Sequence, residues 1–207
     1  MNRKEASRKT TRELILKATR NLLAGKGAAD CTIRDIAKKA GVSPASVVVH
    51  FKSKTALFEE ALYADIENAL SALISSVPRG SDLPAQLMHL AKGMLLFYDR
   101  DRDLYRNLLR HTLFEPESET PKMSGQSERY MQFLAELAEE QKKRGAIRPE
   151  VNPGVAAFSI FSLYLGALTV LFRMPEMTVD HIAAGLNAMT DQFVQGLKGR
   201  RDERTGT

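Results

Sequence analysis

The chain has 207 residues, 43% hydrophobic and 27% charged, so it is long enough to fold into one or two compact domains that each bury a core. Its single cysteine, Cys31, excludes an intrachain disulfide and makes a reducing, cytoplasmic compartment the default expectation. The four histidines are scattered, and the sequence contains neither a glycine-rich phosphate loop nor a nucleophile with its base. We therefore expect no enzyme, no metal and no cofactor.

The net charge of +5 conceals an uneven distribution. Residues 1–54 contain 13 lysines and arginines against 4 acids, a net charge of +9, whereas residues 55–207 carry a net charge of −4. A small domain that neutralises phosphates beside a domain that does not explains this asymmetry, and a solvated basic face is the alternative. The first basic residues suggest an arm ahead of the first helix, which either follows phosphates or is a disordered tail. They are Arg3, Lys4, Arg8, Lys9 and Arg12.

Hydrophobic spacing over the first 40 residues predicts two helices. The first carries a stripe from Leu14 to Leu22 and ends near the glycines at 25 and 27. The second begins after Thr32, which stands three residues before Asp35 in a threonine and acid version of a capping box, and Gly41 closes it.

The next residues open a third and a fourth helix. Ser43 is the expected N-cap and Pro44 the first helical residue of a short helix that runs to about His50. Two short helices joined by a tight glycine turn form a helix-turn-helix. Ser53 and Lys54 then open a longer helix with apolar residues at helical spacing.

The segment TIRDIAKKAGVSPASVVVHFKSKTALF, at residues 32–58, resembles the DNA-binding segment of the tetracycline-repressor (TetR) family of transcriptional regulators. The resemblance covers residues 10–70 and rests on residues at the family's spacing. These are Gly27, Thr32, Ile36, Ala37, Gly41, Val42, Ser43, His50, Phe51, Lys54, Leu57 and Phe58.

The resemblance implies an all-α homodimer of about nine helices per chain. A DNA-binding domain with its basic arm would occupy residues 1–54, a ligand-binding and dimerisation domain residues 55–198, and a disordered tail residues 199–207. The expected function is a cytoplasmic repressor that a small, largely apolar effector releases from a palindromic operator.

The residues expected at DNA lie at helix starts and along the recognition helix. Phosphates are attracted to free N–H groups at helix N-termini, and base edges are reached from the start of the recognition helix. The resemblance also assigns His50 to the DNA backbone. The full set is Thr32, Arg34, Ser43, Pro44, Ala45, Ser46, Val48, Val49, His50, Lys52 and Lys54.

The sequence departs from the family where three valines follow one another. The family usually has an aromatic residue, most often tyrosine, at Val48 and another aromatic near Val49. Val47 is expected inside, so Val48 and Val49 should turn partly outward. There they would either lie against thymine methyl groups or pack against the first helix. Ala28, where the family commonly has an aromatic residue, is a second departure.

Beyond Pro78, periodicity and punctuation predict helices at about 83–99, 101–114, 125–144, 152–173 and 178–198. The apolar run 155–172 has the length of a membrane span. Interspersed polar residues and the missing aromatic belt and basic flanks favour a buried helix instead, so we expect no membrane. A stripe on the last helix is expected to build a four-helix dimer interface with this run. It comprises Ile182, Leu186, Met189, Phe193 and Leu197.

Aromatic and methionine residues are abundant on the middle helices, where the family places its ligand. Such residues at helical spacing also form ordinary cores, and both readings stay open. The candidate ligand-binding residues are Met94, Tyr98, Leu108, His111, Phe114, Phe133, Phe161 and Tyr164, with Tyr98 and His111 as polar anchors. A rival hypothesis is a DNA-binding regulator that answers to a protein partner and has no small-molecule effector.

Overall fold

The computed structural model describes residues 3–26, 30–112, 117–118 and 120–197, and at a few helix ends (3–4, 24, 26 and 111–112) only the backbone. Within these residues the fold is all-helical, with nine α-helices and no strand, as the sequence predicted. The chain divides into two compact units, Met1–Asn68 with Asp101–Gln126 and Ala69–Arg100 with Ser127–Thr207. The tail expected at residues 199–207 lies outside the described residues.

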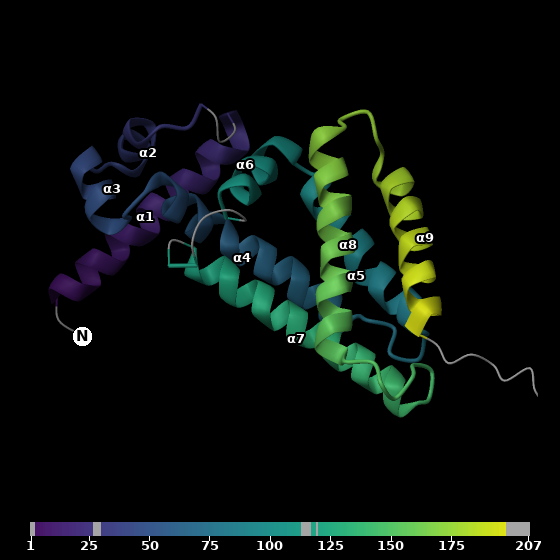
Figure 1. Cartoon of the computed structure of the whole chain (residues 1–207). Coiled ribbons are helices and arrows are strands. Elements are labelled where there is room, and N and C mark those ends of the chain that lie inside the picture. The colour runs from purple at the N-terminus through teal and green to yellow at the C-terminus, as the bar shows by residue number, and fades with distance from the viewer. Residues whose placement is uncertain (1–2, 27–29, 113–116, 119, 198–207) are drawn as a thin grey trace, which may run out of the picture. The chain divides into compact units, whose positions relative to one another are not determined.

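The first unit contains the helix-turn-helix. Helix α1 (Arg3–Lys26) packs against α2 (Ile33–Ala40), and α2 packs against α3 (Pro44–His50) (Figure 1). The first part of α4 (Lys54–Ser75) and α6 (Arg102–Thr112) complete this unit.

The core of the first unit is made by one apolar residue or more from each of these helices. Ile15, Ile36, Val47 and Leu57 are fully enclosed, and Leu108 of α6 is buried in the same unit. Burial of such side chains stabilises the fold by about 1.5–3 kcal/mol each.

The expected arm is part of α1. We expected residues 3–12 ahead of the first helix, but α1 begins at Arg3. The segment has no glycine or proline to stop a helix, and Glu5 stands four residues before Lys9, in the order that supports one. α1 also continues through Gly25 to Lys26, one turn past the apolar stripe.

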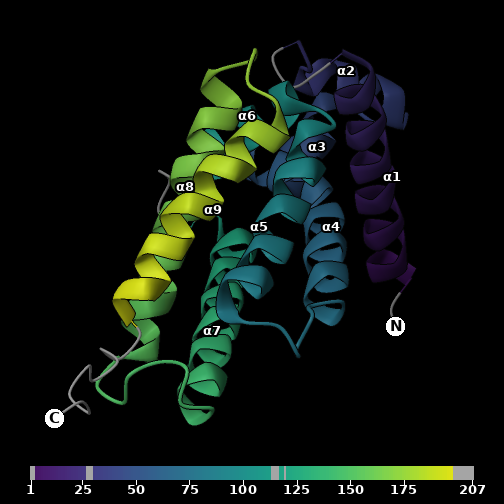
Figure 2. The ribbon, with the colours of Figure 1, turned by 90° about the vertical axis from the view of Figure 1, so that its right-hand side faces the viewer.

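The second unit contains α5 (Leu83–Asp99), α8 (Pro153–Arg173) and α9 (Val179–Leu197), with the end of α4 and most of α7 (Pro121–Lys143). α9 packs against α5 and α8, and Figure 2 shows α9 and α8 side by side.

A glycine of α5 lies close to a side chain of α4 within this unit. A Cβ added to Gly93 would come within 2.3 Å of a methyl carbon of Leu73, so a larger residue would require the Leu73 side chain to move. The predicted spans of the C-terminal helices agree with the observed ones within four residues. The largest difference is the start of α7, which begins at Pro121 and not near residue 125.

One described helix, α8, is long and apolar enough to cross a membrane by length and composition alone. Its most apolar window has a mean hydropathy of 2.1, and 39% of that window is buried inside the chain. A core helix of a soluble protein passes the same test, so these values do not indicate a membrane span.

Candidate nucleic-acid interface

Local hydrogen bonds fix the helix-turn-helix. The Thr32 hydroxyl accepts the Asp35 N–H at 3.2 Å, while the Thr32 N–H donates to the Asp35 carboxylate at 3.1 Å, which completes the predicted capping box. Gly41 ends α2 with φ at 71°, a left-handed conformation that glycine adopts without strain. Ser43 accepts the Ser46 N–H at 3.1 Å and caps α3.

The residues expected at DNA lie on or beside α2 and α3 and at the start of α4. Most of them are exposed, and Ser46 and His50 are half-buried. The N–H and hydroxyl of Thr32 already bond to Asp35, so a phosphate at this position would have to displace that carboxylate.

The three valines divide between the core and the surface. Val47 is 0% exposed, whereas Val48 and Val49 are 60% and 73% exposed. The expectation that one valine packs inside and two turn outward is confirmed, and neither outer valine packs into the core. Ala45 is also exposed and lies three and four residues before them, on the same face of α3.

The surroundings of this face are basic. No aspartate or glutamate occurs from Ile36 to Phe58, while α2 exposes Lys38 and Lys39 and the loop after α3 exposes Lys52. Lys54 is the first residue of α4, and its Nζ lies 5.1 Å from the ring centroid of Phe58. A surface with exposed cations and no acids attracts phosphate.

His50, the last residue of α3, does not carry a positive charge in the free protein. Desolvation by burial lowers its pKa, and the positive charges of Arg8 and Arg12 lower it further. The imidazole is therefore neutral at pH 7, and it can donate one N–H to a phosphate oxygen but adds no cation to the free protein.

Arg12 joins three elements at the back of the recognition helix. Its Nε and Nη2 atoms bind the two carboxylate oxygens of Glu60 on α4, and its Nη1 donates to the His50 carbonyl at 2.8 Å. Its guanidinium carbon lies 4.4 Å from the Phe51 ring centroid. We expected Arg12 in a basic arm, and the structure instead commits it to these contacts. Sequence reasoning missed this role because Glu60 is 48 residues away.

A second set of contacts ties the start of α7 to α4. The Glu59 carboxylate accepts the Met123 N–H at 2.9 Å, and Lys122 lies 3.5 Å from a Glu60 oxygen. Burial raises the pKa of Glu59, although hydrogen bonds from the backbone of Met123 and Lys122 oppose the increase. Glu59 thus caps α7 from another helix, which explains why α7 begins before the predicted residue.

Some of the candidate ligand-binding residues form an aromatic cluster inside the second unit. The Tyr164 ring centroid lies 6.4 Å from that of Phe161 and 6.5 Å from that of Tyr130, and Tyr98 packs on Phe172 at 6.1 Å. The Tyr164 hydroxyl is buried and, among the described residues, has no hydrogen-bond partner. Burial, together with neighbouring Tyr98 and Tyr130, raises the pKa of Tyr164, so this hydroxyl stays protonated.

Of the other candidate ligand-binding residues, Met94 and Phe133 are buried in the second unit, where the Arg79 guanidinium covers the Phe133 ring, and Leu108 belongs to the first unit. The structure describes only the backbone of His111, and Phe114 lies outside the described residues.

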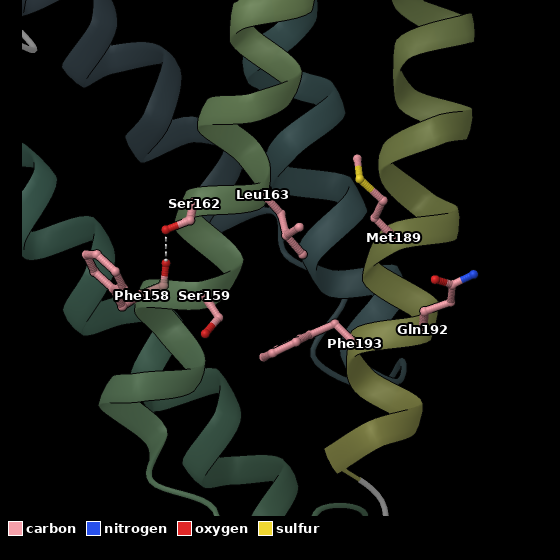
Figure 3. A pocket seen from close by; sticks show the side chains of 7 residues that line it. All are labelled: Phe158, Ser159, Ser162, Leu163, Met189, Gln192 and Phe193. Atoms are coloured by element: carbon pink, nitrogen blue, oxygen red, sulfur yellow. Dashed lines mark hydrogen bonds between the residues drawn. The ribbon is translucent and has the colours of Figure 1, made fainter.

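An open hollow of about 630 Å³ lies on the outer faces of α8 and α9. Figure 3 shows Leu163 and Phe193 pointing into the space between the two helices. Along α8 the exposed residues from Val155 to Thr169 carry no charge, and Phe158 is 64% exposed. On α9, Ile182 and Leu186 of the predicted stripe are buried against their own chain. The second half of the stripe, Met189, Phe193 and Leu197, is therefore left for contact with another surface.

Comparison with known proteins gives one family. Residues 15–61 match the model for bacterial regulatory proteins of the tetR family. The chain is 31% identical over 191 residues to the nucleoid occlusion factor SlmA of Vibrio campbellii, with 88% of this chain and 97% of that protein covered. It is 23% identical over 195 residues to the HTH-type transcriptional regulator UidR of Escherichia coli K12, with 91% and 95% covered.

A solved structure shares the fold. It is FadR of Thermus thermophilus, a TetR-family transcriptional repressor in complex with lauroyl-CoA. The TM-score is 0.73 at 19% identity, and 95% of this chain and all of that chain are covered.

Proposed function

Because the chain belongs to the tetR family of bacterial regulatory proteins, and so is a DNA-binding regulator, we propose that it represses transcription as a homodimer on a palindromic operator and is released by a small, largely apolar effector. The observation that carries DNA binding is the exposed face of α3, which has exposed lysines beside it and lies in a stretch, Ile36 to Phe58, that contains no acid. The proposed contacts are Thr32, Arg34, Ser43, Pro44, Ala45, Ser46, Val48, Val49, His50, Lys52 and Lys54. We propose that residues 1–54 form the DNA-binding domain and that residues 55–198 form the domain for effector binding and dimerisation.

The outer faces of α8 and α9 support the proposed dimerisation. Val155 and Phe158 are each 64% exposed, and large apolar side chains gathered on one surface mark an interaction site. A two-fold dimer through this surface would cover the hollow at Phe193 and present two recognition helices to successive major grooves. We also propose that the protein acts in the cytoplasm, where it would bind the chromosome.

The effector site that we propose is the cluster around Tyr164. A buried hydroxyl without a partner costs about 1–3 kcal/mol, and a ligand that supplies a hydrogen-bond acceptor removes this cost. The aromatic surroundings favour an apolar ligand body. Because FadR was solved with lauroyl-CoA, acyl-CoA thioesters are the first compounds to test.

Thermal unfolding with a series of acyl-CoA thioesters tests this site, since a ligand of the folded state raises the melting temperature by mass action. Tyr164→Phe should reduce the shift because it removes the hydroxyl and keeps the ring. Tyr105→Phe, the same change at a buried tyrosine of the first unit, is the control and should leave the shift unchanged. No shift with any thioester, or an equal shift in Tyr164→Phe, contradicts the proposed site.

Release from DNA requires that the effector prefer one state of the protein over the other, since equal affinity shifts nothing. Helices α4 and α7 each contribute residues to both units and are the proposed carriers of the change. Operator binding measured with and without effector tests this step. A transcription assay on the same operator separates repression from activation.

The resemblance to SlmA favours a second function. Identity to this relative, 31%, exceeds the 23% identity to the transcriptional regulator UidR. A nucleoid occlusion role predicts altered positioning of cell division relative to the nucleoid in cells without the protein, whereas a local repressor occupies sites beside the genes that it controls and its loss changes their transcription. Division and transcription compared in host cells with and without the protein distinguish the two.

A further inference from the structure

One face of helix α3 consists of exposed side chains that cannot form hydrogen bonds. Ala45, Val48 and Val49 lie at positions i, i+3 and i+4 and therefore share one face, and all three are exposed. Pro44, one turn before Val48, is exposed as well. Val47 takes the position that the core of the unit requires, so the two outer valines are not needed for packing.

In the major groove, each base pair presents hydrogen-bond donors and acceptors, and thymine alone presents a methyl group. A polar side chain recognises the donors and acceptors of the bases, but valine has neither a donor nor an acceptor in its side chain. An aliphatic face can therefore make a favourable contact only with the thymine C5-methyl group. Other bases are disfavoured at the same position, because their polar edges would be buried without a hydrogen-bond partner.

We propose that Val48 and Val49 set the sequence specificity of this protein by packing against thymine methyl groups in each operator half-site. This inference rests on the proposed DNA-binding function and names the base that the recognition helix selects. Valine suits the role because its branched Cβ restricts χ1 on a helix, so little side-chain freedom is lost on contact.

Charge and size select DNA over a protein as the occupant. The face is small, three side chains on a seven-residue helix, whereas a stable protein interface needs 20–30 residues on each side. Its neighbours Lys38, Lys39 and Lys52 are exposed cations, and no acid occurs from Ile36 to Phe58. A duplex supplies phosphates to these cations and methyl groups to the valines at the same time.

The test begins with selection of an operator from random duplex DNA by the full-length protein. Thymines of each half-site are then replaced singly by uracil, which removes only the methyl group. We expect a loss of about fivefold per half-site at one or two thymines, the lower end of what one altered base pair costs. Changed in both half-sites together, the same thymine should cost about 25-fold.

Three variants complete the test. Val48→Ala and Val49→Ala remove exposed side chains and should leave folding intact, and each should lose the uracil effect at the thymine that it contacts, which closes a double-mutant cycle. Lys52→Ala is the matched control. It should weaken binding to every duplex by the same factor and keep the uracil effect in full.

The outcomes distinguish a failure of the valine–thymine proposal from a failure of the proposed DNA-binding function. Enrichment of no sequence, and no binding to duplex DNA, contradicts the proposed function itself. An enriched operator that binds equally well with uracil at every thymine contradicts the valine inference alone. Uracil and valine effects that simply add show that the methyl groups and the valines act independently, and this also overturns the inference.

Discussion

Replacement of Arg12 tests whether the back of the recognition helix is held by one side chain. In Arg12→Ala, Glu60 of α4 loses its ion pair with Arg12 and keeps the one with Lys122, α3 loses the hydrogen bond to the His50 carbonyl, and the Phe51 ring loses its cation. The change should destabilise the protein and weaken its binding to all DNA sequences, because the end of α3 is no longer fixed.

The size of the effect follows from these three contacts. The partly exposed ion pair contributes about 1 kcal/mol, the charge-assisted hydrogen bond about 1.5 kcal/mol and the cation–π contact about 0.5 kcal/mol. Water replaces part of this at a side chain that is 38% exposed, which leaves a loss of about 2 kcal/mol. For a chain of this length the melting temperature should fall by about 4–8 °C.

Arg12→Lys is the matched control, because it keeps the charge but cannot form the two-pronged contact with Glu60. Thermal unfolding followed by circular dichroism and operator binding followed by fluorescence anisotropy measure both effects. We expect Arg12→Lys to lose about half as much stability as Arg12→Ala loses, and to lose part of its affinity for the operator. If Arg12→Lys matches the wild type in both assays while Arg12→Ala loses affinity in a salt-dependent way, Arg12 contacts phosphate and does not position α3.

Four further changes have defined outcomes. Lys54→Ala should lower affinity for every duplex and reduce the slope of log affinity against log salt by about one charge per half-site; a changed sequence preference with an intact slope would show that Lys54 touches no phosphate. Phe193→Arg should give monomers in sedimentation, since it places a charge in the hollow between α8 and α9, and a persistent dimer refutes that interface. Glu59→Gln removes a carboxylate whose pKa is raised by burial. Ionisation of Glu59 therefore lowers wild-type stability as pH rises from about 4.3 through its folded pKa, so the variant should gain stability relative to the wild type between pH 4 and pH 7 in urea unfolding; a relative loss reverses the sign of that pKa shift. Val48→Tyr, the residue common in the family, should raise affinity for DNA in general through a phosphate hydrogen bond while weakening the preference for thymine in a binding selection, and a sharper preference contradicts the role given to Val48.

The helix-turn-helix was predictable because each of its boundaries depends on neighbouring residues. The caps of α2 and α3 and the glycine turn between them involve side chains within a few positions of the backbone groups that they bind. The burial of Val47 and the exposure of its two neighbours also follow from one short helix. Capping and period are local properties, so a single sequence contains them.

Long-range contacts were not predictable in the same way. The role of Arg12 depends on Glu60, 48 residues away, and the start of α7 depends on Glu59, 64 residues before Met123. The segment around Arg12 was read as an arm because its charges resemble those of a DNA-binding tail, and charge alone does not distinguish a tail from the first turns of a helix. The aromatic residues of the middle helices share one pattern, yet only the fold separates those beside Tyr164 from those in other parts of the core.

Selection of DNA from a random pool by the full-length protein, followed by anisotropy titration of the enriched duplex at two salt concentrations, tests whether this protein is a sequence-specific DNA-binding dimer. We expect a palindromic sequence with thymine at matched positions of both half-sites, bound by two chains with an affinity that falls as salt rises. Failure to enrich any sequence, or binding that is the same on enriched and random duplexes, contradicts it.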